Sequence, residues 1–427
     1  MKFIRIALLC IVVLSQYTQK ICAQGTLKIT TEQAERLFLE KNLQLLAERY
    51  NIAIADAEIV QAKLLNNPTI GVGDVNFWYP NAAEELGLSS TSFGNKIVYS
   101  VELEQMISTA GKRRKLVDME KVSKEIAIQE FEAFLLGLKT ELRTALIETV
   151  YLQSYLEIIK IQMESIAGLV EAYKIQSSKG NIAKSELIRL QASLIELETE
   201  YNEFLTELHK QYKSLKMLLN ITPETEITIL PTGITNKNPD EILLSDLLEM
   251  AKHSHPEFKL SDLNIRYNEK LLAYEKSQRV PDIALSFNYD RYGGVWKDFI
   301  GVGVKVDIPV FNRNQGNIKI AKLKIEQSNY YAEHQKNSII HEITESYEHY
   351  TISYNFYKRL MDNDFFEELE NILEVYTRNL LNRNINMLEY LDFMDAYKTT
   401  KQAILIAKKN LDTNFAELQF SVNNIIN

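Results

Sequence analysis

Three carboxylates spaced three residues apart stand out near the end of the sequence. They are Glu389, Asp392 and Asp395, in the stretch LEYLDFMDAY at residues 388–397. On a helix this spacing places the three side chains along one stripe. Such a stripe could act in acid/base catalysis, hold a metal ion or form a solvated helix face. The helices and strands around it determine which of these three roles is possible.

The remaining motifs predict no catalysis and no cofactor. HEITE, at residues 341–345, has Glu345 where a zinc-protease helix needs its second histidine. HSHPE could bind a metal through His253 and His255, but its position favours a turn that starts a helix. We therefore expect no enzyme, no cofactor and no metal site, and we interpret the basic GKRRK at residues 111–115 as the junction between a strand and a helix.

Composition indicates a large folded and exported chain. Of its 427 residues 46% are hydrophobic and 25% charged, and only 8 are proline and 15 glycine, which favours long uninterrupted elements. Residues 1–23 read as a signal peptide that contains both cysteines. Removing it takes away three positive charges, so the formal net charge falls from -9 to -12, which argues against a nucleic-acid partner.

Three matched stretches in the same order predict an internal duplication. NNPTIGVGDVNF resembles RVPDIALSFNYD, YSVELEQMISTAGKRRK resembles VKVDIPVFNRNQGNIK, and YKIQSSKGNIAKSELIRLQ resembles YTRNLLNRNINMLEYLDFM. We expect a first repeat at residues 24–230, a linker at 231–241 and a second repeat at 242–427. Each repeat should run helix, strand, strand, long helices.

The strands alternate between an apolar and a polar face, which is typical of half-buried strands. Glycines 301 and 303 should face a barrel lumen or relieve crowding between strands. The apolar positions expected to face lipid are Ile283, Leu285, Phe287, Tyr289, Ile300, Val302, Val304 and Val306. Four strands are too few for a transmembrane barrel, which needs about eight, so subunits would have to pool their strands.

The helices are long and carry heptad seams. No proline interrupts residues 112–176, and a helix of that length would extend about 100 Å. Apolar residues recur at steps of three and four from Leu187 to Leu218, and again from Tyr390 to Leu418. The second seam directs Asp392 and Asp395 away from the packed side and leaves Glu389 at its flank.

On these residues the chain resembles the TolC family of outer-membrane efflux proteins. The resemblance covers the tandem halves, the strands PTIGVG and VPDIALSFNY, the string IPVFNRNQGNI and the hairpin tip YKIQSSKGNIAKSELIRLQASL. The string IPVFNRNQG is most similar to the heavy-metal cation branch. The resemblance implies a mainly α protein with a transmembrane β portion, whose trimer forms a twelve-stranded outer-membrane β-barrel continued by a periplasmic α-helical barrel.

The resemblance also implies partners and site residues. The partners would be two further copies of the chain, outer-membrane lipid, a periplasmic adaptor (membrane fusion protein) and an inner-membrane pump of RND type. Glu389, Asp392 and Asp395 would form a pore constriction. The adaptor-docking tips would comprise Lys179, Gly180, Asn181, Ser185, Arg383 and Asn384. Arg383 stands where the first tip has Gly180, which puts adaptor contact at the second tip in question.

We therefore expect a passive exit duct for metal cations in the outer membrane of a Gram-negative bacterium. The alternatives are the outer-membrane channel of a type I secretion or drug-efflux system, and a soluble periplasmic coiled-coil scaffold. The strand alternation argues against the scaffold. For the carboxylate stripe, a solvated helix face stays an alternative to a charged pore.

Overall fold

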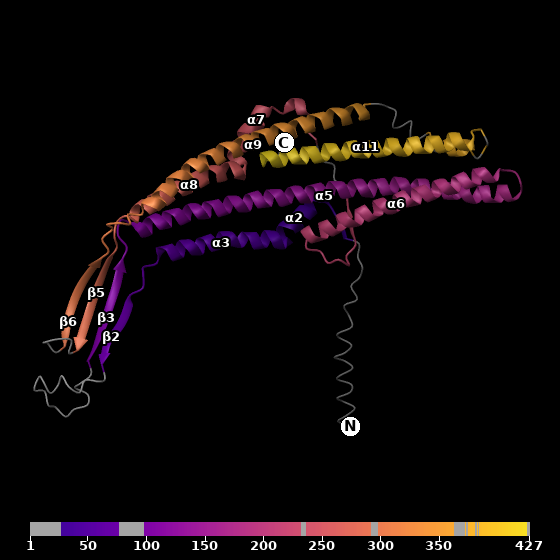
Figure 1. Cartoon of the computed structure of the whole chain (residues 1–427). Helices are drawn as coiled ribbons and strands as arrows, with labels where there is room; N and C mark the ends of the chain where they lie inside the picture. The colour runs from indigo at the N-terminus through magenta and orange to yellow at the C-terminus, as the bar shows by residue number, and fades with distance from the viewer. Residues whose placement is uncertain are drawn as a thin grey trace, which may run out of the picture. The chain divides into compact units, whose positions relative to one another are not determined.

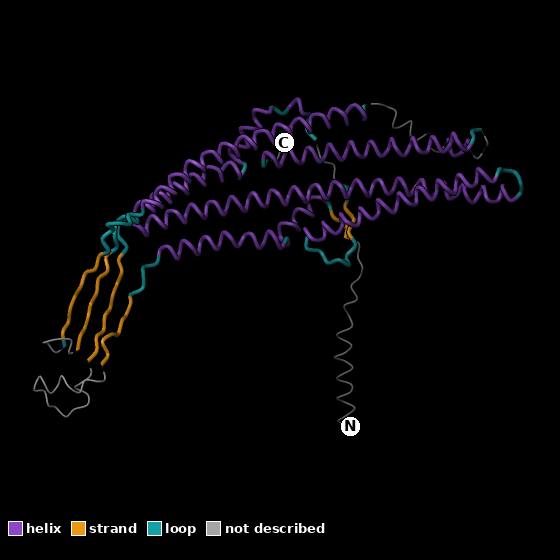
Figure 2. Tube along the Cα trace, viewed as in Figure 1, coloured by secondary structure: helices purple, strands orange, loops and turns teal. Residues whose placement is uncertain are grey.

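The computed structural model describes residues 27–76, 98–231, 236–291, 298–362, 372, 375–380, 382 and 384–424. The expected signal peptide, part of the expected linker and Arg383 lie outside these residues. The described chain consists mostly of helices, with two small sheets (Figures 1 and 2). It forms two compact units, in which unit 1 comprises residues up to 46, 134–254 and 341–427, and unit 2 comprises 47–133 and 255–340.

Both expected repeats contain two helices, two strands and two long helices in the same order, and the first repeat also has a short strand at each end. The first runs β1 (Leu27–Ile29), α2 (Thr31–Lys41), α3 (Leu43–Lys63), β2 (Thr69–Asn76), β3 (Val98–Ile107), α5 (Lys112–Ser178), α6 (Lys184–Leu218) and β4 (Ile227–Ile229). The short helix η2 (Pro239–Glu241) lies in the expected linker, and the second repeat runs α7 (Leu244–Ser254), α8 (Pro256–Ser277), β5 (Ile283–Arg291), β6 (Phe299–Val306), α9 (Gln315–Met361) and α11 (Met387–Val422). This recurrence accords with the predicted duplication, whose exact boundaries stay a prediction.

Helix α5 has the length that the proline-free run predicts. Its 67 residues correspond to about 100 Å of helix. In unit 1 its apolar side packs with α6 and α11 around one core of aromatic and aliphatic side chains. Leu190 and Leu197 of the first predicted seam and Tyr390 of the second are buried in this core, so both seams are confirmed as packing surfaces.

In unit 2 the four longer strands form one antiparallel sheet in the order β2-β3-β5-β6. Leu285 pairs with Val304 and Phe287 with Val302, so apolar residues of neighbouring strands share a face. The pairing of β2 with β3 is irregular between Gly73 and Asn76, where the sequence alternates least cleanly. β1 and β4 form a separate two-stranded parallel sheet in unit 1.

Within the described residues, no helix combines the length and the apolar composition that crossing a membrane requires.

Candidate functional site

The first helix tip, between α5 and α6, is closed by a Schellman turn. The N–H of Asn181 donates to the carbonyl of Gln176 over 3.0 Å, and the N–H of Gly180 donates to the carbonyl of Ser177 over 3.0 Å. This pair of bonds requires the first residue after the helix to adopt the left-handed backbone conformation. Gly180 is that residue and has a φ of 78°. The predicted tip residues Lys179, Gly180 and Asn181 therefore lie at an exposed and well-defined turn.

The second tip repeats part of this arrangement. The N–H of Asn384 donates to the carbonyl of Asn379 over 2.8 Å, as Asn181 does to Gln176. The amide side chains of these pairs also bond, at 3.3 Å from Asn384 to Asn379 and 2.9 Å from Asn181 to Gln176. Arg383 lies outside the described residues, so its place in this turn stays a prediction.

Glu389 takes part in starting helix α11. The Asn386 side chain accepts a hydrogen bond from the Glu389 N–H over 2.9 Å, and the Glu389 carboxylate accepts one from the Asn386 N–H over 3.2 Å. These reciprocal bonds form a capping box, which satisfies N–H groups that have no partner inside the helix. The sequence analysis missed this role, although Asn followed three residues later by Glu is a known sign of a helix start.

The apolar core fixes the direction of the carboxylate stripe. The Tyr390 side chain is fully buried, with its hydroxyl 3.2 Å from the Ser165 hydroxyl, and the Phe393 ring stacks on Tyr376 with 4.0 Å between centroids. Asp392 and Asp395 are exposed on the other side of α11. This agrees with the predicted orientation of both aspartates. It is compatible with a pore-facing stripe and with a solvated helix face.

Asp395 differs from the other two acids because a cation lies beside it. Its carboxylate is 3.8 Å from the Lys398 ammonium, which is also 2.8 Å from the Glu200 carboxylate. Glu200 in turn accepts a hydrogen bond from the Tyr155 hydroxyl. Burial, then this bond to Glu200, raise the pKa of Tyr155, so the phenol stays protonated. Among the three acids, Asp395 is therefore the one whose negative charge is partly offset by a nearby positive charge, that of Lys398.

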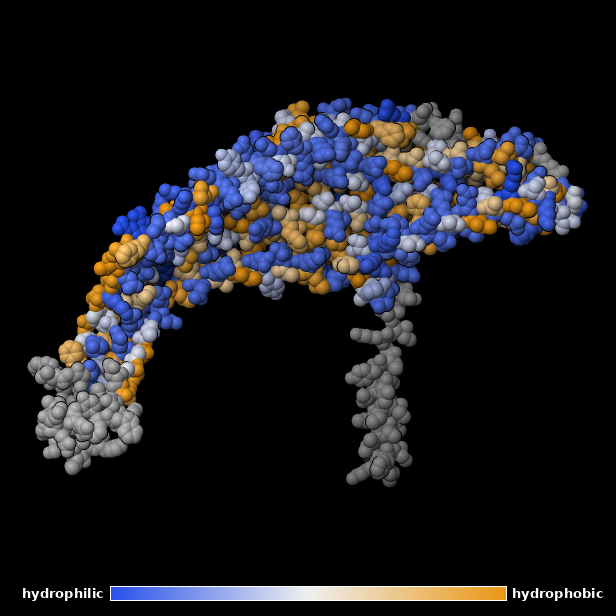
Figure 3. All heavy atoms as spheres, in the orientation of Figure 1, coloured by the Kyte–Doolittle hydropathy of each residue, from blue (hydrophilic) through white to orange (hydrophobic). Residues whose placement is uncertain are grey.

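The sheet of unit 2 separates apolar from small and charged side chains. Val302 is 80% exposed on the apolar face, which also carries the exposed side chains of Leu285, Phe287, Ile300, Val304 and Val306. Ile283 and Tyr289 on the same face are half-buried. Figure 3 shows apolar side chains along the margins of the strands. Exposed apolar side chains on strands of this length are suited to contact with membrane lipid. The contact with lipid stays a prediction.

The glycines of β6 leave room on the polar face for side chains of the neighbouring strand β5. A Cβ added at Gly301 would lie 2.3 Å from the Asn288 amide oxygen, and one at Gly303 would lie 2.6 Å from the Ser286 hydroxyl. Of the two roles that the sequence left open, relief of crowding between strands is thus confirmed. Glu102 and Glu104 of β3 lie in register with Asn288 and Ser286, so this face also carries carboxylates.

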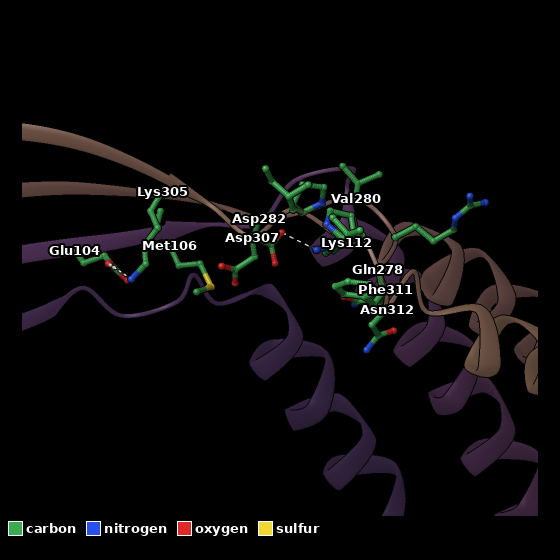
Figure 4. Close-up of a pocket in the computed structure, with 16 residues that line it drawn as sticks. Glu104, Met106, Lys112, Gln278, Val280, Asp282, Lys305, Asp307, Phe311 and Asn312 are labelled. Atoms are coloured by element: carbon green, nitrogen blue, oxygen red, sulfur yellow. Dashed lines mark ion pairs between the residues drawn. The ribbon is translucent and has the colours of Figure 1, made fainter.

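A pocket of about 540 Å³ lies where the sheet joins the helices of unit 2 (Figure 4). Lys112, at the start of α5, contacts the Asp282 carboxylate at 2.8 Å, and Lys305 lies 3.8 Å from Glu104. Burial raises the pKa of Asp282, but the bonds from Lys112 and Thr109 outweigh it and hold this pKa below its usual range. The ion pair of Lys112 with Asp282 indicates that this site holds the start of α5 against the start of β5. It lies at the strand-to-helix junction that GKRRK predicts.

The two histidines of HSHPE have separate structural roles. His255 caps the start of α8, where its Nδ1 accepts from the Glu257 N–H over 3.3 Å. His253 lies in the last turn of α7, 3.4 Å from the Glu249 carboxylate. The predicted helix-start turn is confirmed. In the described part of the chain, no group of three or more His, Cys, Asp or Glu side chains could hold a metal ion.

Comparison with known proteins identifies the fold. No model of a known protein family matches the sequence. The cobalt-zinc-cadmium resistance protein CzcC of Cupriavidus metallidurans is 21% identical over 296 residues, which span 68% of this chain and 65% of CzcC, less than two thirds of its length.

Two solved structures match almost the whole chain. The CmeC outer membrane channel of Campylobacter jejuni has a TM-score of 0.75 with 14% identity, over 92% of this chain and 85% of CmeC. CusC, whose crystal structures concern the conformational changes that accompany folding and transmembrane channel formation, has a TM-score of 0.70 with 14% identity. The match covers 92% of this chain and 92% of CusC. The expected resemblance and fold class are confirmed: the chain has the fold of these outer-membrane channels.

Proposed function

We propose that this chain, with the fold of CmeC and CusC, forms a homotrimeric exit duct in the outer membrane of a Gram-negative bacterium. The duct passes substrates that an inner-membrane pump and a periplasmic adaptor deliver, and it catalyses no reaction. One observation carries the proposal: a sheet with an exposed apolar face and a helix about 100 Å long, α5, occur together in that fold.

The sheet supports the trimer. β2 and β6 end the strand order, and neither pairs on its outer side with another described strand. Unpaired backbone N–H and C=O groups are too costly in lipid, where no water replaces the missing bond. Three copies supply twelve strands and join every β2 to a β6, which leaves no edge.

The carboxylate stripe supports cation passage. Glu389 and Asp392 are exposed next to the second tip, and threefold symmetry would bring each of them into a ring around the axis. A ring of carboxylates attracts cations and repels anions. Metal cations are the leading substrates, because the name of CzcC denotes resistance to cobalt, zinc and cadmium. The two tips, including Ser185 and Arg383, would contact the adaptor.

Fractionation of cells and planar-bilayer recording test the proposal. We expect the protein in the outer-membrane fraction, as a trimer that survives in detergent and conducts ions in bilayers. Recovery as a soluble periplasmic protein without a detergent-stable trimer would contradict the duct and favour a coiled-coil scaffold.

A further inference from the structure

A small cavity lies in unit 1, where α5 and α11 meet the start of α2 (Figure 1). Its lining includes Thr31, the first residue of α2, together with residues between 143 and 154 of α5 and between 405 and 412 of α11. The volume is about 80 Å³. One water molecule needs about 10–15 Å³ of a cavity, so this one has room for a few water molecules or for one small ion.

The charged side chains that line the cavity are mostly positive. They are Arg143 of α5, with Lys408, Lys409 and Asp412 of α11, so the lining carries two positive charges in excess. Much of the remaining wall is apolar and consists of Leu146, Ile147, Val150 and Leu405. Apolar walls lower the local dielectric constant, which strengthens the attraction of these cations for an anion.

Two acids that pair with the cations lie outside the lining. The Arg143 guanidinium contacts the Glu35 carboxylate, and the Lys409 ammonium is 3.0 Å from the Glu148 carboxylate. Neither Glu35 nor Glu148 is among the described residues that line the cavity. Both acids therefore hold their cations in place without filling the space between α5 and α11.

Asp412 is the one acid in the described lining, and its carboxylate is already engaged. Its Oδ1 atom is 2.7 Å from the Lys408 ammonium and accepts a hydrogen bond from the Asn236 side chain over 3.1 Å. The Lys409 ammonium lies 4.4 Å from the centre of the Tyr151 ring, which also lines the cavity. The cations are thus fixed around the cavity by contacts that leave some of their N–H groups without an acceptor.

Arg143 shows this lack of an acceptor directly. Its Nη2 bonds the Glu35 carboxylate, whereas its Nε is buried and has no hydrogen-bond partner in the described part of the chain. A buried donor without an acceptor is unfavourable, and more so when the group is charged. An oxygen atom of a bound anion would provide the acceptor.

We propose that this cavity binds one tetrahedral oxyanion of the size of inorganic phosphate. Three cations from two helices surround it, and four oxygens can accept from all of them, whereas a planar carboxylate offers only two oxygens. The anion joins α5 of the first repeat to α11 of the second. All of these residues belong to one copy of the chain, so the inference does not depend on the proposed duct.

Calorimetric titration of the purified full-length protein in detergent with inorganic phosphate tests the site. We expect one phosphate per chain. The variant Arg143→Lys keeps the positive charge but lacks Nε, and it should bind phosphate about tenfold more weakly, through loss of one hydrogen bond to a charged group. The absence of saturable binding to the wild type, or equal binding to both proteins, would overturn the inference.

Melting temperatures give a second readout with a matched pair of variants. Lys408→Gln removes a cation of the cavity, whereas Lys210→Gln removes an exposed cation of α6 that pairs with Glu207. Phosphate stabilises folded proteins in general because it is excluded from their surface. A bound anion adds a saturable increase, which we expect in the wild type and in Lys210→Gln and not in Lys408→Gln.

Two further outcomes decide the inference. Equal increases in all three proteins would overturn it and leave the proposed duct untouched. Acetate at the same ionic strength should bind more weakly than phosphate, and tighter binding of acetate would contradict a tetrahedral anion. If Lys408→Gln does not fold, the titration of Arg143→Lys still decides, because that variant retains the charge beside Glu35.

Discussion

At the scale of single residues, Glu389 combines a structural and a proposed functional role. Its carboxylate completes the capping box of α11 and remains exposed beside Asp392. Replacing it by alanine would remove both roles at once, because the carboxylate that accepts from the Asn386 N–H would be lost together with the charge. A variant that keeps the hydrogen bond and removes only the charge separates the two.

We therefore predict that Glu389→Gln with Asp392→Asn reduces cation selectivity and leaves thermal stability almost unchanged. Glutamine can replace glutamate in a capping box, whereas the charge that attracts cations is lost. Reversal potentials in planar bilayers under a salt gradient measure the selectivity. Asp395→Asn is the matched control and should have a smaller effect, because Lys398 lies beside this carboxylate. Unchanged selectivity in the double variant would remove the stripe from the constriction.

Gly180 is a second residue whose role depends on conformation. We predict that Gly180→Ala lowers the free energy of unfolding by about 1–2 kcal/mol, because a Cβ disfavours the left-handed conformation at φ 78°. Gly168→Ala in α5 is the control. It should stabilise by about 0.5–1 kcal/mol, since a Cβ there meets open space within a helix. Calorimetry of both variants checks the opposite signs.

At the scale of elements, the start of α8 couples stability to pH. Burial, more than the opposing effect of Glu257, lowers the pKa of His255 below the ordinary 6.5. The unfolded chain then binds more protons than the folded chain near this pH. Stability should therefore fall as pH drops from 7 through 6.5 towards the folded pKa.

The variant His255→Asn isolates this effect. Asparagine accepts the capping hydrogen bond and does not titrate. We predict that the melting temperature of the wild type decreases more than that of the variant between pH 7 and pH 5. Equal decreases would show that other groups account for the pH dependence.

At the scale of the whole molecule, the substrate depends on what the pump delivers as well as on the duct. Deleting the gene should sensitise cells to divalent metal cations if the duct serves metal efflux. A toxicity screen with zinc, cobalt, cadmium and copper beside common drugs measures this. Sensitivity to drugs alone would favour a drug-efflux channel, and loss of a secreted protein would favour type I secretion.

The sequence by itself determined the elements and the faces they present. Alternation at period two predicted strands β5 and β6, and steps of three and four predicted the sides of α6 and α11 that Leu190 and Tyr390 bury. Local spacing is sufficient here because period and handedness fix which side chains share a face. For the same reason the outward direction of Asp392 could be predicted from its neighbours.

Only the tertiary structure decided which distant groups meet. Glu200 and Lys398 lie 198 residues apart in the sequence and 2.8 Å apart in space, and no spacing rule links them. The exposure of Tyr50 on α3 and of Tyr330 on α9 likewise emerged from what each helix leaves uncovered. A pattern shows that a helix has an apolar stripe, but a partner from elsewhere in the chain decides whether it is buried.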